Sequence, residues 1–583
     1  MNIKNLGLQY FWGILLVLNI LFLWTFSFFH FLSPLIGYAS ICFSLVYMIW
    51  IIRNYSPTII VKKIRELELL YIIIIVLCGI FIVANFISAF SPITGTDTLT
   101  ARMNNPKRYV QNSGFVSLPY SLASNMSLGV EMLYVIAILI NWDIFANLIA
   151  VFISILLIYS IFCFGNKYFG ARVGILTVAL IISTNTFYSY SSLPFQDFIA
   201  ALFLLLSLNA TLDYYNNDDF RLLILMGIFA GAAASVKLNS GIFIICLFLS
   251  LGYILTIKKR NIFLLLFPLL TAFVIYLPWM IKSFVITGDP FYPMFTKLFP
   301  LKYPHNIFLI NDLAGASFYL DIKKILIYPF EVSFNPRIYG GFLGPTIILA
   351  FISAIFYRFW RNRVLLLLFI FSAIVYIFHF LTLGGFPPIP RYIFISIIFV
   401  ALIASWGIEE IHNINLKKIL VGFLMGWLLF FTMFTIYKKV DNYRYIFGNL
   451  SKNEFLEKVN GGFKQINTFE YLNKTVPRQK KVLLFDLRAY YLEANYVLAQ
   501  RLEQELNFAG IDNDDCIFEY LLEKNITYVY YQLYDSETEI FINNTHIKLF
   551  EVFRRMVDKG YFQEIYHDDK SKSFIYEIKS REY

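Results

Sequence analysis

Residues 222–286 decide the fold class, and their sequence is LLILMGIFAGAAASVKLNSGIFIICLFLSLGYILTIKKRNIFLLLFPLLTAFVIYLPWMIKSFVI. Three apolar runs, at 222–236, 239–257 and 261–286, are separated only by short polar turns. A helix needs about 20 apolar residues to cross roughly 30 Å of hydrocarbon. Because these runs are apolar nearly throughout, the stretch predicts three successive transmembrane helices.

The same pattern covers most of the chain. Of its 583 residues, 58% are hydrophobic and 15% are charged, whereas soluble domains contain about 45–50% apolar and about 25% charged residues. We therefore predict a polytopic α-helical membrane protein with about 13 transmembrane helices and a small C-terminal extracytoplasmic α/β domain. The predicted spans are 8–31, 35–52, 68–90, 144–164, 173–190, 196–213, 222–236, 239–257, 261–286, 342–357, 363–383, 392–409 and 419–436.

One further apolar run, at 129–141, is too short for a full crossing. At 1.5 Å per residue it rises about 20 Å, so we predict a partial or re-entrant helix. Basic turns then set the orientation, because short loops rich in Lys and Arg stay in the cytoplasm. The turns at 258–260, 358–363 and 417–418 carry such residues. Thirteen crossings would place the N-terminus inside and the C-terminal part outside a bacterial inner membrane.

The chain divides into three predicted regions. Residues 1–67 contribute two additional N-terminal helices, 68–436 form the main membrane module with outer loops 91–128 and 287–341, and 437–583 form the α/β domain. In the last region, period and composition predict helices at 453–474, 514–524 and 546–559 and strands at 481–487, 526–532, 561–567 and 573–579.

Composition also excludes several classes of function. The net charge of +10 is expected from basic cytoplasmic loops, so nucleic acid is not a predicted partner. The five cysteines are odd in number and lie mostly in apolar runs, which argues against a disulfide framework and against zinc-ligand spacing. Walker and GxGxxG phosphate-binding motifs are absent from the sequence.

Two acidic residues lie where apolar runs meet the outer side. Asp97 follows the third predicted span by a few residues, and Asp197 opens the sixth. An ionisable group at a membrane boundary is a functional hypothesis, because its desolvation is costly without a partner or a role. Helix capping is the alternative for both, with Asp97 preceding a helix that starts at Leu99.

Two basic residues occupy outer turns against the positive-inside trend. Lys237 lies between two apolar runs, and Arg391 follows a proline-rich turn. Such cations suit a phosphate ligand. Snorkelling toward lipid head groups is the alternative for each of them.

The ordered set of segments resembles bacterial GT-C glycosyltransferases related to the protein O-mannosyltransferases and the lipid A aminoarabinose transferase. The resemblance covers most of the membrane part, and no single motif in it is specific. It is carried by DTLT at 97–100, PKRY at 106–109, LGVEMLY at 128–134, PFQD at 194–197, GAAASVK at 231–237, PWMIKSFVITGDPFYP at 278–293 and RY at 391–392.

The resemblance implies a transferase that takes a hexosyl or pentosyl group from a polyprenyl-phosphate donor to a glycan, lipid or protein acceptor. It implies Asp97 as the catalytic base and Lys237 and Arg391 as ligands of the donor phosphate. Asp197 and Glu131 would shape the sugar and acceptor pocket. The sequence departs from the related patterns at Arg102, where many bacterial relatives carry a histidine after an aromatic residue. We place Arg102 in the same pocket.

The chemistry is consistent with that mechanism. A polyprenyl phosphate is a competent leaving group once cations hold its charge, so the enzyme needs mainly a carboxylate and cations. No nucleotide-sugar site is needed, and a divalent cation is the one candidate cofactor. The alternatives are a lipid-linked glycan flippase or other transporter, and a polysaccharide polymerase or ligase that shares the donor.

Overall fold

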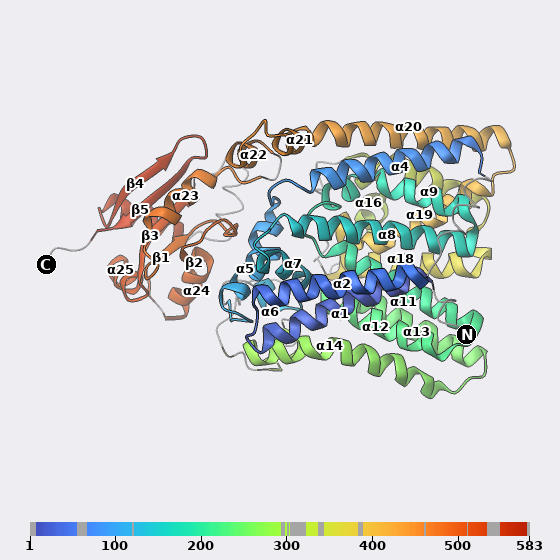
Figure 1. The fold of residues 1–583 in the computed structure, drawn as a ribbon, viewed down its shortest axis with the longest axis horizontal. Helices are drawn as coiled ribbons and strands as arrows, with labels where there is room; N and C mark the ends of the chain where they lie inside the picture. Colours follow the sequence, from blue (N-terminus) through green and yellow to red (C-terminus); the bar gives the residue numbers. More distant parts are fainter. Residues whose placement is uncertain are drawn as a thin grey trace.

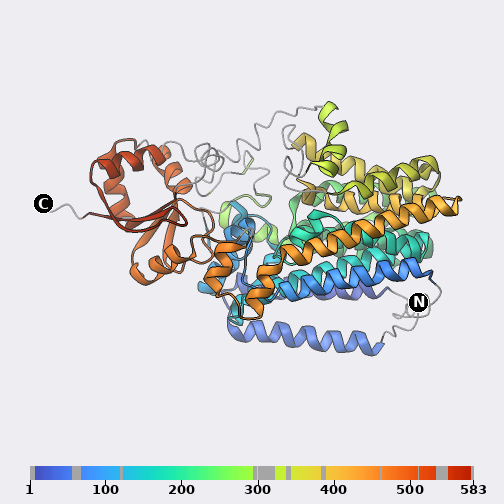
Figure 2. The same cartoon turned by 90° about the horizontal axis from the view of Figure 1, so that it is seen from above.

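The computed structural model is a bundle of long helices with a small sheet domain at one end (Figure 1). Figure 2 shows the same domain beyond the end of the bundle from a second direction. The structure describes residues 7–54, 67–118, 122–292, 298–299, 302, 322–335, 343–382, 389–459, 462–509, 511–532 and 549–579.

Each predicted span contains a helix. These helices are α1 (Leu8–Phe28), α2 (Pro34–Asn54), α4 (Leu69–Ser88), α8 (Phe145–Phe169), α9 (Ala171–Ile182), α11 (Asp197–Asn217), α12 (Phe220–Val236), α13 (Gly241–Ile257), α14 (Leu266–Thr287), α17 (Pro345–Phe356), α18 (Arg363–Thr382), α19 (Phe394–Glu409) and α20 (Ile414–Lys438). Among the described residues, ten helices are long and apolar enough to cross a membrane, while α9, α12 and α17 are shorter. The predicted fold class is confirmed, but the count of thirteen crossings is not.

The short run after the first outer loop forms α7 (Gly129–Leu139). Its eleven residues rise only about 16 Å, which is less than the hydrocarbon thickness of a bilayer. It packs against α1, α2 and α5 (Asn104–Gln111). Nearly all of its side chains are buried, and they include the carboxylate of Glu131.

Short elements connect the long helices. They are η2 (Thr98–Arg102, a π-helical turn), α6 (Leu122–Asn125), α10 (Asn185–Tyr190), η3 (Leu238–Ser240), η4 (Ile262–Leu265), η5 (Phe359–Arg361), η6 (Pro390–Ile393) and α21 (Val440–Ile446). Most of the predicted outer loop 287–341 lies outside the described residues, apart from α16 (Ile322–Phe334) and a few flanking positions. Figure 1 places α5, α6 and α7 at the end of the bundle that carries the sheet domain.

The sheet domain has strand order β2-β1-β3-β5-β4. Its first three strands pair in parallel, whereas β5 pairs antiparallel with both β3 and β4. The strands are β1 (Lys481–Leu484), β2 (Asn495–Leu498), β3 (Ile526–Gln532), β4 (Phe562–Asp568) and β5 (Ser573–Ile578), and the helices are α22 (Lys452–Lys458), α23 (Ile466–Thr475), α24 (Ala499–Ala509), α25 (Asp514–Glu523) and a helix over 549–558.

The four predicted strands and the helix predicted at 514–524 are confirmed within three residues at either end, whereas the other predictions for this domain are incomplete. The helix predicted at 453–474 is two helices, α22 and α23. The first residues of the helix predicted at 546–559 lie outside the described part of the chain. The sequence analysis predicted neither β2 nor α24. For β2, the reason is that a strand of four residues is too short to show a reliable period.

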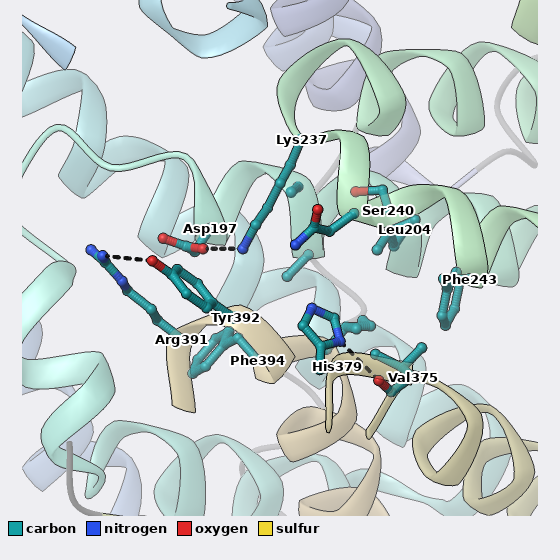
Figure 3. A pocket seen from close by; sticks show the side chains of 14 residues that line it. Asp197, Leu204, Lys237, Ser240, Phe243, Val375, His379, Arg391, Tyr392 and Phe394 are labelled. Atoms are coloured by element: carbon teal, nitrogen blue, oxygen red, sulfur yellow. Dashed lines mark hydrogen bonds and ion pairs between the residues drawn. The ribbon is translucent and has the colours of Figure 1, made fainter. Parts of the chain in front are cut away.

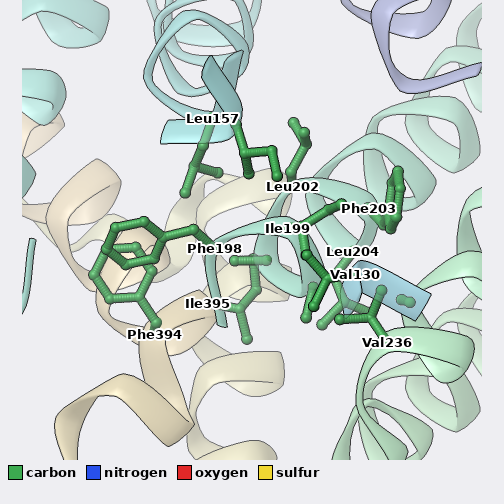
Figure 4. Close-up of a cluster of buried hydrophobic side chains, with 14 of the residues drawn as sticks. Val130, Leu157, Phe198, Ile199, Leu202, Phe203, Leu204, Val236, Phe394 and Ile395 are labelled. Atoms are coloured by element: carbon green, nitrogen blue, oxygen red, sulfur yellow. The ribbon is translucent and has the colours of Figure 1, made fainter. Parts of the chain in front are cut away.

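Helix α11 is the centre of the bundle. Every side chain from Asp197 to Tyr214 is buried, because α8, α12, α13 and α19 surround it. Figure 4 shows Phe198 against Phe394 of α19, with ring centroids 4.6 Å apart. The carboxylate at the first position of α11 is therefore carried into an apolar core, where it needs a partner.

Two glycines bring α12 close to α14. A Cβ added at Gly227 would lie 2.4 Å from the carbonyl oxygen of Pro268, and one at Gly231 would lie 2.4 Å from that of Ala272. Small residues allow helix backbones to approach in this way. The contact fixes the C-terminal end of α12, which carries Lys237.

The predicted orientation can be tested by thiol labelling. In a variant without native cysteines, we expect a membrane-impermeant maleimide to modify Lys524→Cys, in the sheet domain, on intact cells. Lys259→Cys, in a basic turn, should react only after permeabilisation, because such turns stay in the cytoplasm. Labelling in the opposite order would invert the topology.

Candidate active site

Asp97 precedes the π-helical turn η2, and its side chain does not cap that turn. It accepts a hydrogen bond from Nη2 of Arg391, with 2.6 Å between Nη2 and Oδ2. The Asp97 side chain is 41% exposed, whereas the Arg391 side chain is 9% exposed. A π-helical turn often marks a functional position in a protein. The carboxylate is therefore an accessible group held by a buried cation.

Arg391 is held in place by aromatic rings. Its guanidinium carbon lies 5.1 Å from the ring centroid of Tyr190, 5.0 Å from that of Phe195 and 5.1 Å from that of Tyr392. Its Nε is buried and has no hydrogen-bond partner among the described residues. The side chain thus lies inside the protein and does not snorkel, and one of its N–H groups has no partner in the described structure.

Asp197 and Lys237 form a second, more deeply buried pair (Figure 3). Nζ of Lys237 donates to Oδ1 of Asp197 at 2.6 Å, and the exposed fractions of the two side chains are 11% and 3%. Nζ also lies 4.5 Å from the ring centroid of Tyr392. Both side chains therefore point into the protein, and neither caps a helix nor snorkels.

Arg102 and Glu131 form the third pair. Arg102, in η2, donates from Nη1 to Oε1 of Glu131, whose side chain is fully buried. The second oxygen of Glu131 and Nε of Arg102 are buried and have no hydrogen-bond partner among the described residues. Buried polar atoms usually find partners in proteins, so a polar ligand or water is expected beside this pair.

The three pairs belong to one cluster. The charges of Asp197 and Asp97 act on Arg102, and those of Arg391 and Arg102 act on Lys237. The predicted site residues thus come together from the first outer loop, α7, α11, the turn after α12 and η6. Their roles in a reaction remain predictions.

A cavity of about 30 Å³ adjoins the cluster and is lined by Asp197, Lys237 and Arg391 among others. It has room for a few water molecules at most, since each needs roughly 10–15 Å³. His379, from α18, also lines it (Figure 3), and its Nδ1 donates to the carbonyl of Val375 at 2.8 Å. Sequence reasoning missed His379, although an ionisable residue within an apolar run was the available signal.

Comparison with known proteins gives a partial match to one family model and a shared fold. Residues 133–281 match the model of the dolichyl-phosphate-mannose-protein mannosyltransferase family. The structure of ArnT from Cupriavidus metallidurans bound to undecaprenyl phosphate has a TM-score of 0.52 at 11% identity, covering 86% of this chain and 97% of that one. The membrane module has the GT-C fold. The resemblance predicted from the sequence is confirmed.

A second structure of the same ArnT, in the apo state, has a TM-score of 0.53 at 12% identity with the same coverage of both chains. The comparison with curated proteins gives no match. The family match includes Asp197 and Lys237 of the GT-C module. Asp97, Glu131 and Arg391 lie outside the matched residues.

The sheet domain holds the first outer loop of the GT-C module in place. The backbone N–H of Tyr490 donates to the carbonyl of Leu99 at 3.2 Å, and Asn104 donates to the hydroxyl of Tyr496 at 2.8 Å. Nζ of Lys107 donates to the carbonyl of Tyr490 and to Glu493, both at 2.7 Å. Burial lowers the pKa of Lys107, and Glu493 opposes that shift.

Sequence reasoning missed these contacts. The segment 490–496 lies between predicted elements and shows no period or motif. It nevertheless contacts the loop that bears Asp97 and Arg102. The sheet domain is thus a structural support of the candidate site.

Two further buried lysines support the outer end of the GT-C module. Lys282 of α14 donates to the carbonyls of Ser124 and Met126, which ties α6 to the bundle. Lys439, at the end of α20, donates to Asn85, Ser88 and Ser192. Both lysines have neutral oxygen partners in the described structure, and both make contacts that order the chain.

A metal site is not evident in the part of the chain that the structure describes. No group of three or more His, Cys, Asp or Glu side chains there could hold a metal ion. The three carboxylates of the cluster each have a cationic partner. A divalent cation in the reaction stays a prediction.

Proposed function

We propose that the protein transfers a sugar from a polyprenyl-phosphate-linked donor to a glycan, lipid or protein acceptor on the extracytoplasmic face. The observation that carries this proposal is the cluster of three carboxylate–cation pairs in a module with the GT-C fold. Transfer of this kind needs a proton acceptor and cations close to the leaving phosphate. The cluster supplies both types of group in contact with each other.

Asp97 is the proposed base because it is accessible. Its side chain is 41% exposed, while those of Asp197 and Glu131 are 3% and 0% exposed. An acceptor hydroxyl must come within hydrogen-bond distance of the base, and only the first of these carboxylates is open to it. Nη2 of Arg391 holds this carboxylate through its 2.6 Å contact with Oδ2.

The reaction then follows in one displacement. The acceptor hydroxyl gives its proton to Asp97 while its oxygen forms a bond to the anomeric carbon. The bond between that carbon and the phosphate oxygen breaks, and the phosphate leaves with the electron pair. Arg391 and Lys237 are the proposed partners of the developing negative charge, and the unpaired Nε of Arg391 supports this role.

The remaining residues are proposed to hold these groups in place. Asp197 positions Lys237 through its 2.6 Å contact. Glu131 positions Arg102, and the unpaired atoms of that pair are proposed to meet hydroxyl groups of the sugar or acceptor. Hydroxyls both donate and accept hydrogen bonds, so they can satisfy a guanidinium N–H and a carboxylate oxygen together.

Arg391→Lys tests the phosphate role, because it keeps the charge and removes the planar fork. We expect weaker binding of undecaprenyl phosphate in nanodiscs and a transfer rate lowered about 10²–10³-fold, the usual cost of losing one charge-stabilising donor. Arg363→Lys, at an exposed position, is the matched control and should change neither value. Unaltered binding and transfer in Arg391→Lys would remove this residue from the donor site.

A further inference from the structure

A second and much larger cleft lies where the first outer loop meets the sheet domain. Its volume is about 820 Å³, within the range of roughly 300–1,000 Å³ that is typical of ligand pockets. It is lined by Arg108, Gln111, Asn112, Leu118, Asn473, Val476, Arg478, Lys481, Glu493, Ala494, Asn495 and Tyr496. The mechanism proposed above uses none of these residues.

The cleft carries uncompensated positive charge. Its one carboxylate, Glu493, is already paired with Lys107 at 2.7 Å. Arg108 donates to two neutral oxygens, Oε1 of Gln111 at 2.9 Å and the carbonyl of Leu492 at 3.1 Å.

The other two cations of the cleft are Arg478 and Lys481. Neither forms an ion pair with any residue that the structure describes. Arg478 is exposed, and Lys481 is half-buried at the start of β1. Three cations therefore face the cleft without an opposing carboxylate of their own, which favours an anionic ligand.

The rest of the lining is rich in side-chain amides. Gln111 and Asn112 come from α5 and the turn after it, and Asn495 comes from β2 on the opposite wall. An amide both donates and accepts hydrogen bonds, which matches the hydroxyl groups of a sugar. The apolar side chains, such as Leu118 and Val476, are few. A lipid tail is thus a poor match for this lining.

We propose that this cleft binds an anionic oligosaccharide, with its acid groups on Arg108, Arg478 and Lys481 and its hydroxyls on the amides. Arg108 lies on α5, which directly follows the turn that bears Arg102. A saccharide in the cleft is thus held beside the loop that carries Asp97. That this saccharide is part of the acceptor rests on the proposed transfer reaction. That the cleft binds it does not.

Binding to the purified full chain in nanodiscs tests the proposal. The probes are tetragalacturonate, a phosphorylated oligomannose, a neutral maltotetraose and a tetraglutamate peptide, each measured by calorimetry. We expect the two anionic saccharides to bind, and the double variant Arg478→Gln/Lys481→Gln to weaken that binding about 100-fold or more, because hydrogen bonds between charged groups are stronger than neutral ones. The first two probes distinguish a carboxylate from a phosphate as the acid group.

The control variant removes the same charge elsewhere on the sheet domain. Arg554→Gln/Lys570→Gln, at exposed positions outside the cleft lining, should leave the affinities within about twofold, because exposed charges more than a Debye length away are largely screened. The proposal would be overturned if maltotetraose bound as tightly as the anionic saccharides, or if the peptide bound more tightly than they do. Equal effects of the two double variants would also overturn it. Asp97→Asn should retain saccharide binding, so failure of the transfer reaction is distinguishable from failure of the cleft.

Discussion

Asp97→Asn is expected to lower sugar transfer by about 10²–10⁴-fold, the usual contribution of a general base. The amide is nearly isosteric with the carboxylate but cannot take the acceptor's proton. Its oxygen can still accept the hydrogen bond from Arg391 that the carboxylate accepts at 2.6 Å. The protein should therefore fold normally and bind undecaprenyl phosphate. The measurement is transfer of labelled sugar by the purified variant with donor and acceptor from membranes of the source organism.

Asp441→Asn is the matched control for this variant. Asp441 also pairs with an arginine, Arg444 at 3.4 Å, but it lies in α21, away from the cluster. We expect its transfer rate to equal that of the wild type. Near wild-type transfer by Asp97→Asn would show that the base lies elsewhere, and Asp197 would be the next residue to test.

Lys237→Met is expected to destabilise the protein by about 3–5 kcal/mol, the usual cost of leaving one charge of a buried pair without its partner. Asp197 would be that charge, because its side chain is only 3% exposed. Adding Asp197→Asn to the Lys237→Met variant removes the unpaired negative charge and should restore most of the lost stability. Thermal unfolding in detergent measures both variants.

The exposed pair of Arg172 and Glu68 provides the control. Its side chains are 42% and 56% exposed, so Arg172→Met should cost less than about 1 kcal/mol. Binding of undecaprenyl phosphate adds a second measurement. The double variant of Lys237 and Asp197 should be stable yet bind the lipid weakly if the lysine holds the phosphate. Wild-type stability of Lys237→Met would contradict the buried pair.

The helices could be predicted because their signal is local. In hydrocarbon, the backbone must satisfy its own hydrogen bonds, so an apolar run becomes a helix whatever its neighbours are. The run at 222–236, for example, is α12 within two residues. The local sequence signal is weaker in the sheet domain, because a short strand forms only when its partner strands are present. β2, with four residues, was therefore missed.

The candidate site was predictable residue by residue but not as a set of pairs. Asp97 and Arg391 each stood out as an ionisable group at a membrane boundary. Their contact joins positions 294 residues apart, and no local pattern encodes such a distance. Capping and snorkelling were consistent with the sequence as well. The structure decided against both, because these side chains bind each other within the protein.

The sequence by itself determined that this chain enters a membrane, where its helices lie and which charges lie at their ends, because hydropathy and charge are properties of short segments. Only the tertiary structure decided which carboxylate meets which cation. Helix α11 is enclosed by its neighbours, so the buried carboxylate of Asp197 needs a cationic partner. Lys237 is that partner. The arrangement depends equally on segment 490–496. This segment packs against the first outer loop, which bears Asp97, and the two together line the large cleft.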